Sequence, residues 1–410
     1  MANGPSEQPA AIVIRPDREG AVYDIGETIS FHIEPTGAGE LPEELPYALT
    51  WDGALPITAG VVHPGGCIEV RVDQPGFVRL KVGERPAEKG PPVPIAQAAV
   101  AVAPECIQPS LPPPEDFDAF WRERLAEDGP AREPVVQLHE EQKEATVYCV
   151  MLPGPGGYLA GPDSQDNIYA WLLRPKGPGP FPAVVRYHGS GIYGVSPENG
   201  LDLAARGLMV LSVNSQALPN DEPREFYVAL RESGSPLADY RTRPEAFVRM
   251  LRRATRAANY LATRPDWDGR HLISEGHSQG AGQAITAAAL SLHVTALVIS
   301  CATLCDHTRP LIGGPAGWPK IIPFIDGKPD PEKLAAARYI DGMNFAPRIS
   351  CPAYFGICFL DDLCPPTGAY ATFNSLRGLK SARHEPAIGH IYTDGWREAS
   401  YAWMDEHIRT

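Results

Sequence analysis

The sequence predicts an α/β protein, with a mostly parallel sheet covered by helices on both faces, preceded by a small all-β domain. Three observations support this prediction. The first hundred residues contain short strand-like runs bounded by Gly, Pro or Asp, without helical periodicity. After about residue 105, near-continuous apolar runs alternate with helical segments, as in a parallel sheet buried on both faces. A length of 410 residues fits one large domain plus a smaller one.

The first domain is expected over residues 1–104 as an immunoglobulin-like β-sandwich. Its expected strands lie at 10–16, 28–35, 47–53, 67–73, 76–83 and 97–104. The region contains no cluster of catalytic residue types. A proline-rich connector then leads to a predicted helix in which Phe117, Phe120, Trp121 and Leu125 recur at helical spacing. The second domain is therefore expected over residues 105–410.

The second domain is expected to begin its sheet with an antiparallel hairpin, residues 145–154 and 167–177, joined by a long glycine-rich loop. Buried strands are expected at 181–191 and 208–216, and further strands at 271–276, 295–303, 353–360 and 382–388. The expected helices lie at 200–207, 243–263, 281–292, 367–376 and 395–408, with a proline-rich excursion at 310–331. This alternation predicts helices on both faces of the sheet.

Composition disfavours several classes of partner. The chain has a formal net charge of −14 and no long basic cluster, so neither nucleic acid nor an anionic membrane is expected as a partner. No run approaches about 18 apolar residues, so no membrane-spanning helix is expected. The start of the chain lacks the basic and apolar segments of a signal peptide. That fits a cytoplasmic protein, and equally a secreted or periplasmic one whose signal has been removed.

The eight cysteines are too sparse for a disulfide scaffold of this size. Several lie in apolar runs, where buried free thiols are expected. The sequence contains no Cys-x-x-Cys pair, His-Glu-x-x-His motif or calcium-binding loop. We therefore predict neither a metal nor an organic cofactor.

The sequence Gly-His-Ser-Gln-Gly at 276–280 lies between an apolar run and an alanine-rich helical segment. In this setting Gly-x-Ser-x-Gly is typical of the nucleophile elbow of α/β-hydrolases. Ser278 is expected on a strained turn, where Gly276 and Gly280 leave room that a side chain would block. The alternative is a serine that caps an ordinary helix. The context favours Ser278 as a nucleophile in an α/β-hydrolase fold.

A serine hydroxyl needs a base, and in this fold the partners follow in the order Ser, Asp or Glu, His. The apolar run at 353–360 ends at Asp361 and Asp362, and the run at 382–388 is followed by His390. The carboxyl ends of parallel strands meet at one edge of the sheet, so these side chains are expected near Ser278. His390 would be the general base and Asp361 would orient it.

Spacing alone leaves other assignments open. Asp362 could replace Asp361, either aspartate could cap the following helix, and His390 could cap a helix start. Three further histidines lie near strand ends: His188, His277 and His307. His277 is expected to pack within the elbow, and the other two do not lie on the loop after the last strand.

Two backbone N–H groups are expected to form an oxyanion hole. The residue after the nucleophile, Gln279, supplies one, and the loop after the third strand normally supplies the other. That loop contains His-Gly followed by small residues, which makes Ser190 the candidate for the second donor. A plain glycine turn is the alternative.

From about Pro114 to the end, the sequence resembles the acetyl xylan esterase and cephalosporin C deacetylase family, carbohydrate esterase family 7. The matching segments are PEDFDAFWRERLAE (114–127), FPAVVRYHGSG (181–191), GHSQGAG (276–282), ATLCDH (302–307), NFAPRISCPAYF (344–355), DDLCPPT (361–367) and GH (389–390). The resemblance implies a triad of Ser278, Asp361 and His390, with oxyanion amides at Gln279 and Ser190. The family usually has an aromatic residue at position 190, and segment 214–221 also departs from its pattern.

The resemblance implies a serine carboxylesterase that removes acetyl or another small acyl group from carbohydrate esters through an acyl-serine intermediate. Its partner would be a small acylated carbohydrate or another ester, and a homo-oligomer stays open. One alternative is a peptidase of the prolyl-oligopeptidase kind, although the repeats of a propeller are missing from the sequence. Another is a carbohydrate-binding protein with an inactive hydrolase domain.

Overall fold

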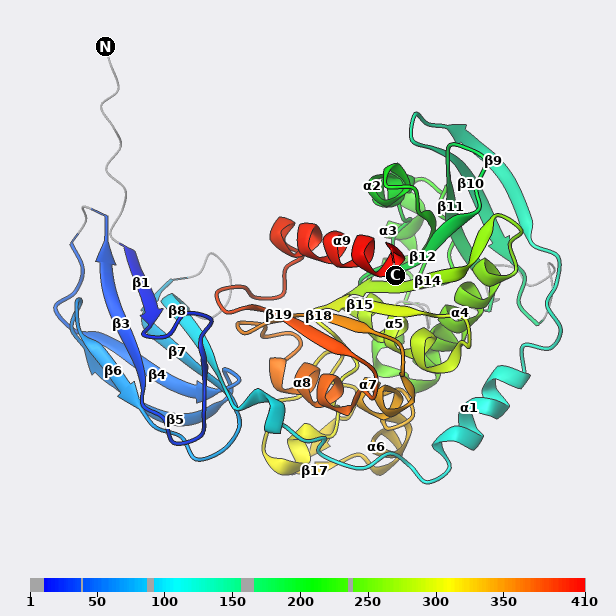
Figure 1. The fold of residues 1–410 in the computed structure, drawn as a ribbon. Helices are drawn as coiled ribbons and strands as arrows, with labels where there is room; N and C mark the ends of the chain where they lie inside the picture. Colours follow the sequence, from blue (N-terminus) through cyan, green and yellow to red (C-terminus); the bar gives the residue numbers. More distant parts are fainter. Residues whose placement is uncertain (1–10, 38–39, 87–91, 156–165, 235–238, 410) are drawn as a thin grey trace, which may run out of the picture.

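The computed structural model describes residues 11–37, 40–86, 92–155, 166–234 and 239–409. In this part of the chain the strands form two small N-terminal sheets, one nine-stranded sheet and a two-stranded hairpin. Figure 1 shows the two small sheets as one body beside the larger α/β part. We call strands β1 to β8 the sandwich and residues 105–409 the hydrolase part.

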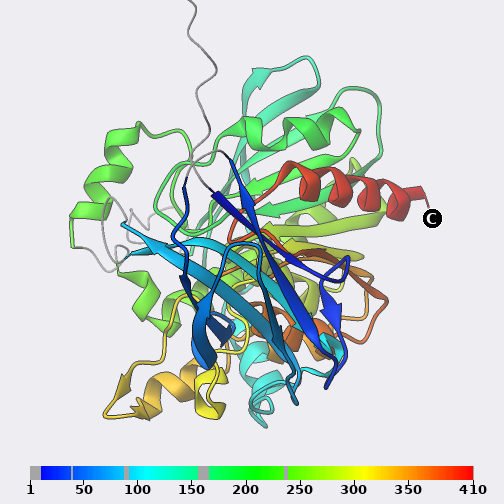
Figure 2. The same cartoon turned by 90° about the vertical axis from the view of Figure 1, so that its left-hand side faces the viewer.

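The sandwich contains a three-stranded sheet of order β1-β3-β6 and a five-stranded sheet of order β2-β8-β7-β4-β5. Its strands are β1 (Ala11–Pro16), β2 (Val22–Tyr23), β3 (Ile29–Thr36), β4 (Leu45–Trp51), β5 (Leu55–Val62), β6 (Cys67–Val70), β7 (Gly76–Arg85) and β8 (Val93–Val102). Alternate residues of β3, namely Ile29, Phe31 and Ile33, are buried in the shared core. The all-β prediction is confirmed, and β2 and β5 are additional to it. Figure 2 looks onto this sandwich.

The hydrolase part is built on a sheet of order β19-β18-β15-β14-β12-β13-β11-β10-β9. Its strands are β9 (Val135–Glu141), β10 (Ala145–Leu152), β11 (Ile168–Pro175), β12 (Phe181–Tyr187), β13 (Met209–Val213), β14 (Trp267–His277), β15 (Ala296–Ser300), β18 (Ala353–Cys358) and β19 (Lys380–Glu385). The predicted antiparallel hairpin is β10 and β11, and the pairs from β13 to β19 are parallel. Residues 156–165 of its connecting loop lie outside the described residues. The edge strand β9 was not predicted.

Helices cover both faces of this sheet, as predicted (Figure 1). They are α1 (Phe117–Ala126), α2 (Leu201–Ala205), α3 (Arg224–Glu232), α4 (Pro244–Ala262), α5 (Gln279–Leu290), α6 (Pro331–Ala337), α7 (Gly342–Phe345), α8 (Pro366–Ser375) and α9 (Asp394–Arg409). The largest core contains residues of α4, α5 and α8, a second contains residues of α2 and α9, and a small third one includes Tyr227 of α3. Between α5 and α7 the chain forms the short hairpin of β16 (Phe324–Ile325) and β17 (Lys328–Pro329), in the predicted proline-rich excursion.

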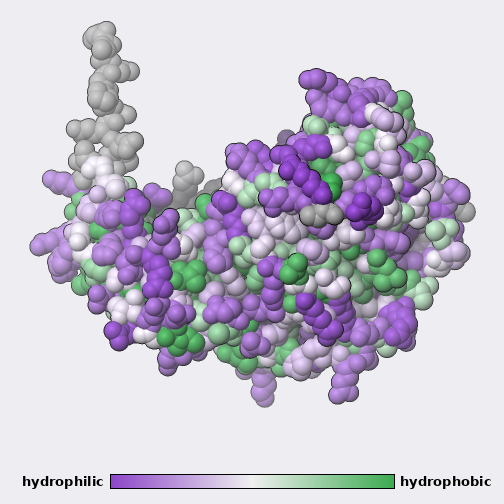
Figure 3. All heavy atoms as spheres, in the orientation of Figure 1, coloured by the Kyte–Doolittle hydropathy of each residue, from purple (hydrophilic) through white to green (hydrophobic). Residues whose placement is uncertain are grey.

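The loops after β18 and β19 lie on the side of the sheet that faces the sandwich (Figure 1). On the face drawn in Figure 3, hydrophilic residues predominate and hydrophobic ones are scattered among them. Among the described residues, no helix combines the length and apolar character that a bilayer crossing needs. The edge of the sheet beside the sandwich is where the predicted site residues come together.

Candidate active site

The turn between β14 and α5 has the geometry of a nucleophile elbow. Ser278 adopts φ 56° and ψ −127°, a backbone conformation that side chains rarely take. A Cβ at Gly276 would lie 2.2 Å from the carbonyl oxygen of Gly280, and one at Gly280 would lie 2.1 Å from the carbonyl oxygen of Tyr187. Glycine is therefore required at both positions, because the strand and helix approach each other too closely for any side chain.

The Ser278 side chain does not cap α5. It makes no capping hydrogen bond, and its Oγ lies 2.7 Å from Nε2 of His390. The Thr303 hydroxyl donates to the carbonyl oxygen of Ser278 at 3.1 Å and ties the elbow to the loop after β15. The hydroxyl oxygen is thus placed beside an imidazole and held on a constrained backbone.

His390 lies on the loop after β19, four positions before α9 begins at Asp394, so it does not cap that helix. Its Nδ1 lies 2.8 Å from Oδ2 of Asp361. Because the carboxylate oxygen accepts, Nδ1 carries the proton and Nε2 is left to accept from the Ser278 hydroxyl. The other carboxylate oxygen of Asp361 accepts the backbone N–H groups of Leu363 and Cys364 at 2.9 and 2.8 Å. Asp361, His390 and Ser278 therefore form one continuous hydrogen-bonded chain.

The neighbouring Asp362 has a different partner from Asp361. Its carboxylate pairs with the guanidinium of Arg79, which comes from β7 of the sandwich. Neither aspartate caps α8, whose N-terminal flank is Pro365 without a side-chain cap. The geometry thus distinguishes the two aspartates, which spacing could not: Asp361 contacts His390, and Asp362 contacts Arg79. Sequence reasoning missed Arg79, because β7 contains four charged residues and no local pattern distinguishes Arg79 from the other three.

The other three histidines are occupied elsewhere or held neutral. His188 contacts the Ser212 hydroxyl at 2.7 Å, and burial lowers its pKa to about 3. His277 contacts the Ser300 hydroxyl at 2.9 Å, and burial, aided by the nearby His390, lowers its pKa to about 4. Burial also lowers the pKa of His307 to about 4. None of them contacts the Ser278 hydroxyl.

Both candidate oxyanion donors lie beside the elbow. Gln279 is the first residue of α5 and is fully buried, and its side chain accepts from the Tyr240 hydroxyl at 2.8 Å. Ser190 is exposed on the loop after β12, and a Cβ at the preceding Gly189 would come within 3.9 Å of the Ser278 Cβ. That distance is ordinary van der Waals contact, so the loop lies next to the nucleophile although a side chain at position 189 would not clash with it.

Segment 214–221, which departs from the family pattern, forms hydrogen bonds to the loop that carries Ser190. The Ser215 hydroxyl donates to the carbonyl oxygen of His188 at 3.0 Å, and the Asn214 amide donates to that of Tyr193 at 3.0 Å. Gln283 of α5 in turn donates to the Ser215 hydroxyl at 2.9 Å. The segment therefore connects the loop that carries Ser190 to the helix that begins at the elbow.

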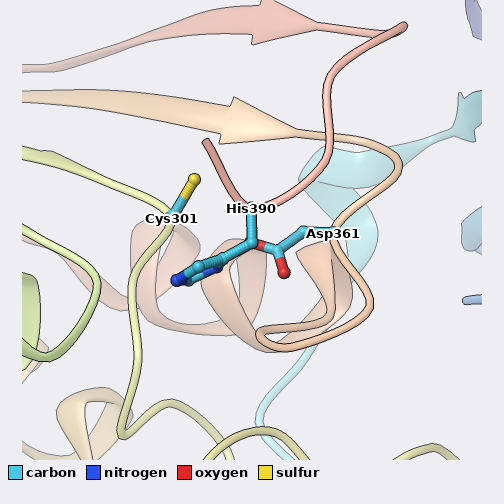
Figure 4. A group of neighbouring side chains, drawn as sticks. All are labelled: Cys301, Asp361 and His390. Atoms are coloured by element: carbon cyan, nitrogen blue, oxygen red, sulfur yellow. The ribbon is translucent and has the colours of Figure 1, made fainter. Parts of the chain in front are cut away.

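Cys301 completes a group of three potential metal ligands with Asp361 and His390, whose donor atoms lie within 4.8 Å of one another (Figure 4). Its thiol lies 3.5 Å from that of Cys358. This neighbour and burial hold the pKa of Cys301 far above its usual value, so the sulfur is a neutral thiol. Metals bind the thiolate, and His390 and Asp361 already contact each other, so these residues fit a proton relay better than a metal site.

Comparison with known families decides the identity of the hydrolase part. A model of the acetyl xylan esterase (AXE1) family matches residues 106–407. The chain belongs to the acetyl xylan esterase family. It is a hydrolase of ester bonds with an α/β-hydrolase fold.

Individual relatives agree with this assignment. The chain is similar to the acetyl esterase Axe7A of Xylanibacter ruminicola, with 29% identity over 320 residues that cover 76% of this chain and 71% of the relative. It is also similar in structure to an acetyl xylan esterase from Paenibacillus sp. R4, with a TM-score of 0.60, 25% identity, and 74% and 98% of the two chains covered. Acetyl xylan esterase 1 from Thermoanaerobacterium shares the fold, with a TM-score of 0.61, 21% identity, and 74% and 97% covered.

Proposed function

We propose that this esterase removes acetyl or other small acyl groups from carbohydrate esters through an acyl-Ser278 intermediate. The observation that carries the proposal is the hydrogen-bonded chain from Asp361 Oδ2 through His390 to the Ser278 hydroxyl, with contacts of 2.8 and 2.7 Å. A hydroxyl, a base and an orienting carboxylate in this order are what acyl transfer to serine requires.

In the acylation step, Nε2 of His390 takes the proton of the Ser278 hydroxyl as its oxygen attacks the ester carbonyl carbon. The negative charge that develops on the carbonyl oxygen is stabilised by the backbone N–H groups of Gln279 and Ser190. When the intermediate collapses, the imidazolium gives its proton to the departing sugar oxygen. Asp361 keeps the ring oriented and stabilises its positive charge.

In the deacylation step, His390 takes a proton from water, and the resulting hydroxide attacks the acyl carbon of the acyl-Ser278 ester. The same two backbone N–H groups stabilise the second oxyanion. Collapse then breaks the bond to Ser278 Oγ, which recovers its proton from the imidazolium, and a free carboxylic acid leaves. The cycle uses no group beyond those of the chain and water.

The substrate class is inferred from relatives and charge. The relatives described above are named as acetyl or acetyl xylan esterases, which supports an acetylated carbohydrate as the substrate. A formal net charge of −14 favours an uncharged or cationic substrate over an anionic one. An acetylated neutral sugar meets both conditions.

The first test is Ser278→Ala with p-nitrophenyl acetate as substrate and a fluorophosphonate as a covalent probe of the serine. Hydrolysis and labelling should both disappear while the melting temperature stays close to that of the wild type. Wild-type rates in the variant would refute the proposal. A silent hydrolase domain would instead show no hydrolysis and no labelling in the wild type.

The second test compares substrates of the wild type: acetylated xylo-oligosaccharides, aryl esters of increasing acyl length, feruloyl esters and aminoacyl amides. We expect a strong preference for acetyl esters. Indifference to acyl length would contradict the small-acyl assignment, and faster turnover of amides than of esters would favour a peptidase of the prolyl-oligopeptidase kind.

We also propose that residues 1–104 and 105–410 are two structural domains. Both sheets of the sandwich end by Val102, the next strand begins at Val135, and the family match begins at residue 106. Limited proteolysis is expected to cut in the proline-rich connector or in surface loops. Cleavage confined to strands of either sheet would contradict this boundary.

A further inference from the structure

Arg79 is a charged residue in the core of the molecule. It lies in the middle of β7, between Val78 and Leu80, and its side chain is fully buried. A buried guanidinium is costly unless its N–H groups find acceptors. The acceptors of Nη1 and Nη2 come from the hydrolase part, at least 280 positions away in the sequence, whereas Nε has no hydrogen-bond partner among the described residues.

The guanidinium binds the loop that follows β18. Its Nη1 donates to the carboxylate of Asp362. Its Nη2 donates to the carbonyl oxygens of Phe359 and Asp361 at 3.2 and 3.3 Å. One planar group therefore binds three acceptors of this loop, one of which is the backbone carbonyl of Asp361, the residue whose side chain contacts His390.

Neighbouring contacts hold Arg79 and the loop against each other. The rings of Phe77 and Phe359 meet edge to face at 5.0 Å between centroids. The Thr367 hydroxyl donates to the buried Asp52 at 2.5 Å. A Cβ at Gly53 would lie 2.8 Å from Arg79 Nη1, so this glycine leaves the space that the guanidinium occupies. We call residues 359–365, between β18 and α8, the acid loop. The sandwich therefore contacts the acid loop through a packed interface that has the Arg79 guanidinium at its centre.

We propose that Arg79 is a positioning residue for ester hydrolysis, through which the sandwich holds the Asp361 loop in its working geometry. The inference rests on the proposed function, because it assigns Arg79 an effect that passes through Asp361 to His390. A fixed backbone at Asp361 keeps the carboxylate in line with His390. Small displacements of such a group lower the rate of the catalysed reaction.

The test uses full-length Arg79→Met and the milder Arg79→Lys, with p-nitrophenyl acetate as substrate. We expect Arg79→Met to lower kcat roughly 10- to 100-fold with little change in KM, because the acid loop loses its restraint while the ester-binding surface is untouched. Arg79→Lys keeps the positive charge but not the planar guanidinium that donates from two nitrogens, so its kcat should lie between those of Arg79→Met and the wild type. The matched control is Asp362→Asn, which weakens the ion pair but keeps both carbonyl contacts and should lose much less.

A double-mutant cycle separates positioning from a general loss of structure. In the Asp361→Asn background, Arg79→Met should cause little further loss of kcat, because the residue through which it acts is already disabled. Melting temperatures of all variants identify any that are unfolded at the assay temperature, and Arg79→Lys then takes the place of Arg79→Met in the cycle.

Two results would overturn the proposal: an unchanged kcat in a folded Arg79 variant, or the same fold-loss in both backgrounds. Neither result touches the assignment of the nucleophile, which Ser278→Ala tests by itself. Conversely, full activity of Ser278→Ala would refute the proposed function whatever the Arg79 variants do.

Discussion

Asp361 and His390 are joined by a contact of 2.8 Å between Oδ2 and Nδ1, and the second oxygen of the same carboxylate accepts two backbone N–H groups. The two backbone N–H groups fix the orientation of the carboxylate, because both of them donate to Oδ1. The imidazole is consequently held in the tautomer whose Nε2 faces the Ser278 hydroxyl.

Asp361→Asn should lower kcat by about 10⁴-fold. The amide oxygen of Asn can replace Oδ1 as the acceptor for the two backbone N–H groups, which directs its NH2 group at Nδ1 of His390. The ring would then carry its proton on Nε2 and could not accept from Ser278. Steady-state kinetics with p-nitrophenyl acetate measure the effect. If Asp362→Asn lost more activity than Asp361→Asn, the assignment of the acid would be wrong.

Gly280→Ala should destabilise the fold by about 3 kcal/mol. Its Cβ would lie 2.1 Å from the carbonyl oxygen of Tyr187, in backbone that cannot move without disturbing β12. Gly395→Ala in α9 is the control, because its Cβ would meet only the far end of the Arg383 side chain at 3.4 Å. Alanine's better helix propensity should make that variant neutral or slightly more stable. Chemical denaturation measures the free energy of unfolding of the two variants. Equal values for Gly280→Ala and Gly395→Ala would contradict the close approach at the elbow.

Ser190 tests the second oxyanion donor. If its backbone N–H is the contributing group, Ser190→Ala should keep most of the activity, since the N–H remains. Ser190→Pro removes that N–H and should cost roughly 10²- to 10³-fold in kcat. The melting temperature of the proline variant serves as the control for local unfolding. A large loss in Ser190→Ala would assign the contribution to the hydroxyl instead.

Asp52 should make the stability of the wild type depend on pH. Burial raises its pKa from 3.8 to about 6, although Thr367 and Arg79 act in the opposite direction. Between these two values the folded state binds a proton that the unfolded state does not, so the contribution of Asp52 to stability becomes more favourable as pH falls. Above about pH 6 the cost of burying its charge is fully present.

Asp52→Asn cannot titrate and provides the reference. The wild-type melting temperature minus that of the variant should therefore rise as the pH is lowered from 7 to about 4.5. The other titrating groups affect both proteins and cancel in the difference. A difference that stays flat or falls over this range would contradict a raised pKa for Asp52.

Much of the fold could be predicted from local sequence because the central elements bury one face or both. β13 and β15 are buried at every position, and their continuous apolar runs predicted them. Among the missed elements, β5 and β9 are largely exposed and α3 buries only Tyr227, whereas α7 is buried but is only four residues long. Periodicity is a signal of burial, so elements at the edges leave little of it in the sequence.

The candidate site was predictable for a different reason. Ser278, Asp361 and His390 each follow a strand of the parallel part of the sheet, and parallel strands bring their carboxyl ends together. The family resemblance pointed to Asp361, but spacing alone could not choose between Asp361 and Asp362, because the contact that occupies Asp362 comes from Arg79, 283 positions away. Contacts between parts of the chain so far apart leave no local pattern.

The position of Arg79 limits how this protein can be recombined with its relatives. A hydrolase part cut free of the sandwich would leave the Asp362 carboxylate and two carbonyl oxygens without their shared donor. A chimera with the N-terminal sheets of another esterase would need an arginine whose guanidinium binds the same loop. In gene shuffling or truncation the two parts should therefore be kept together, because a crossover between them removes the donor that this loop depends on.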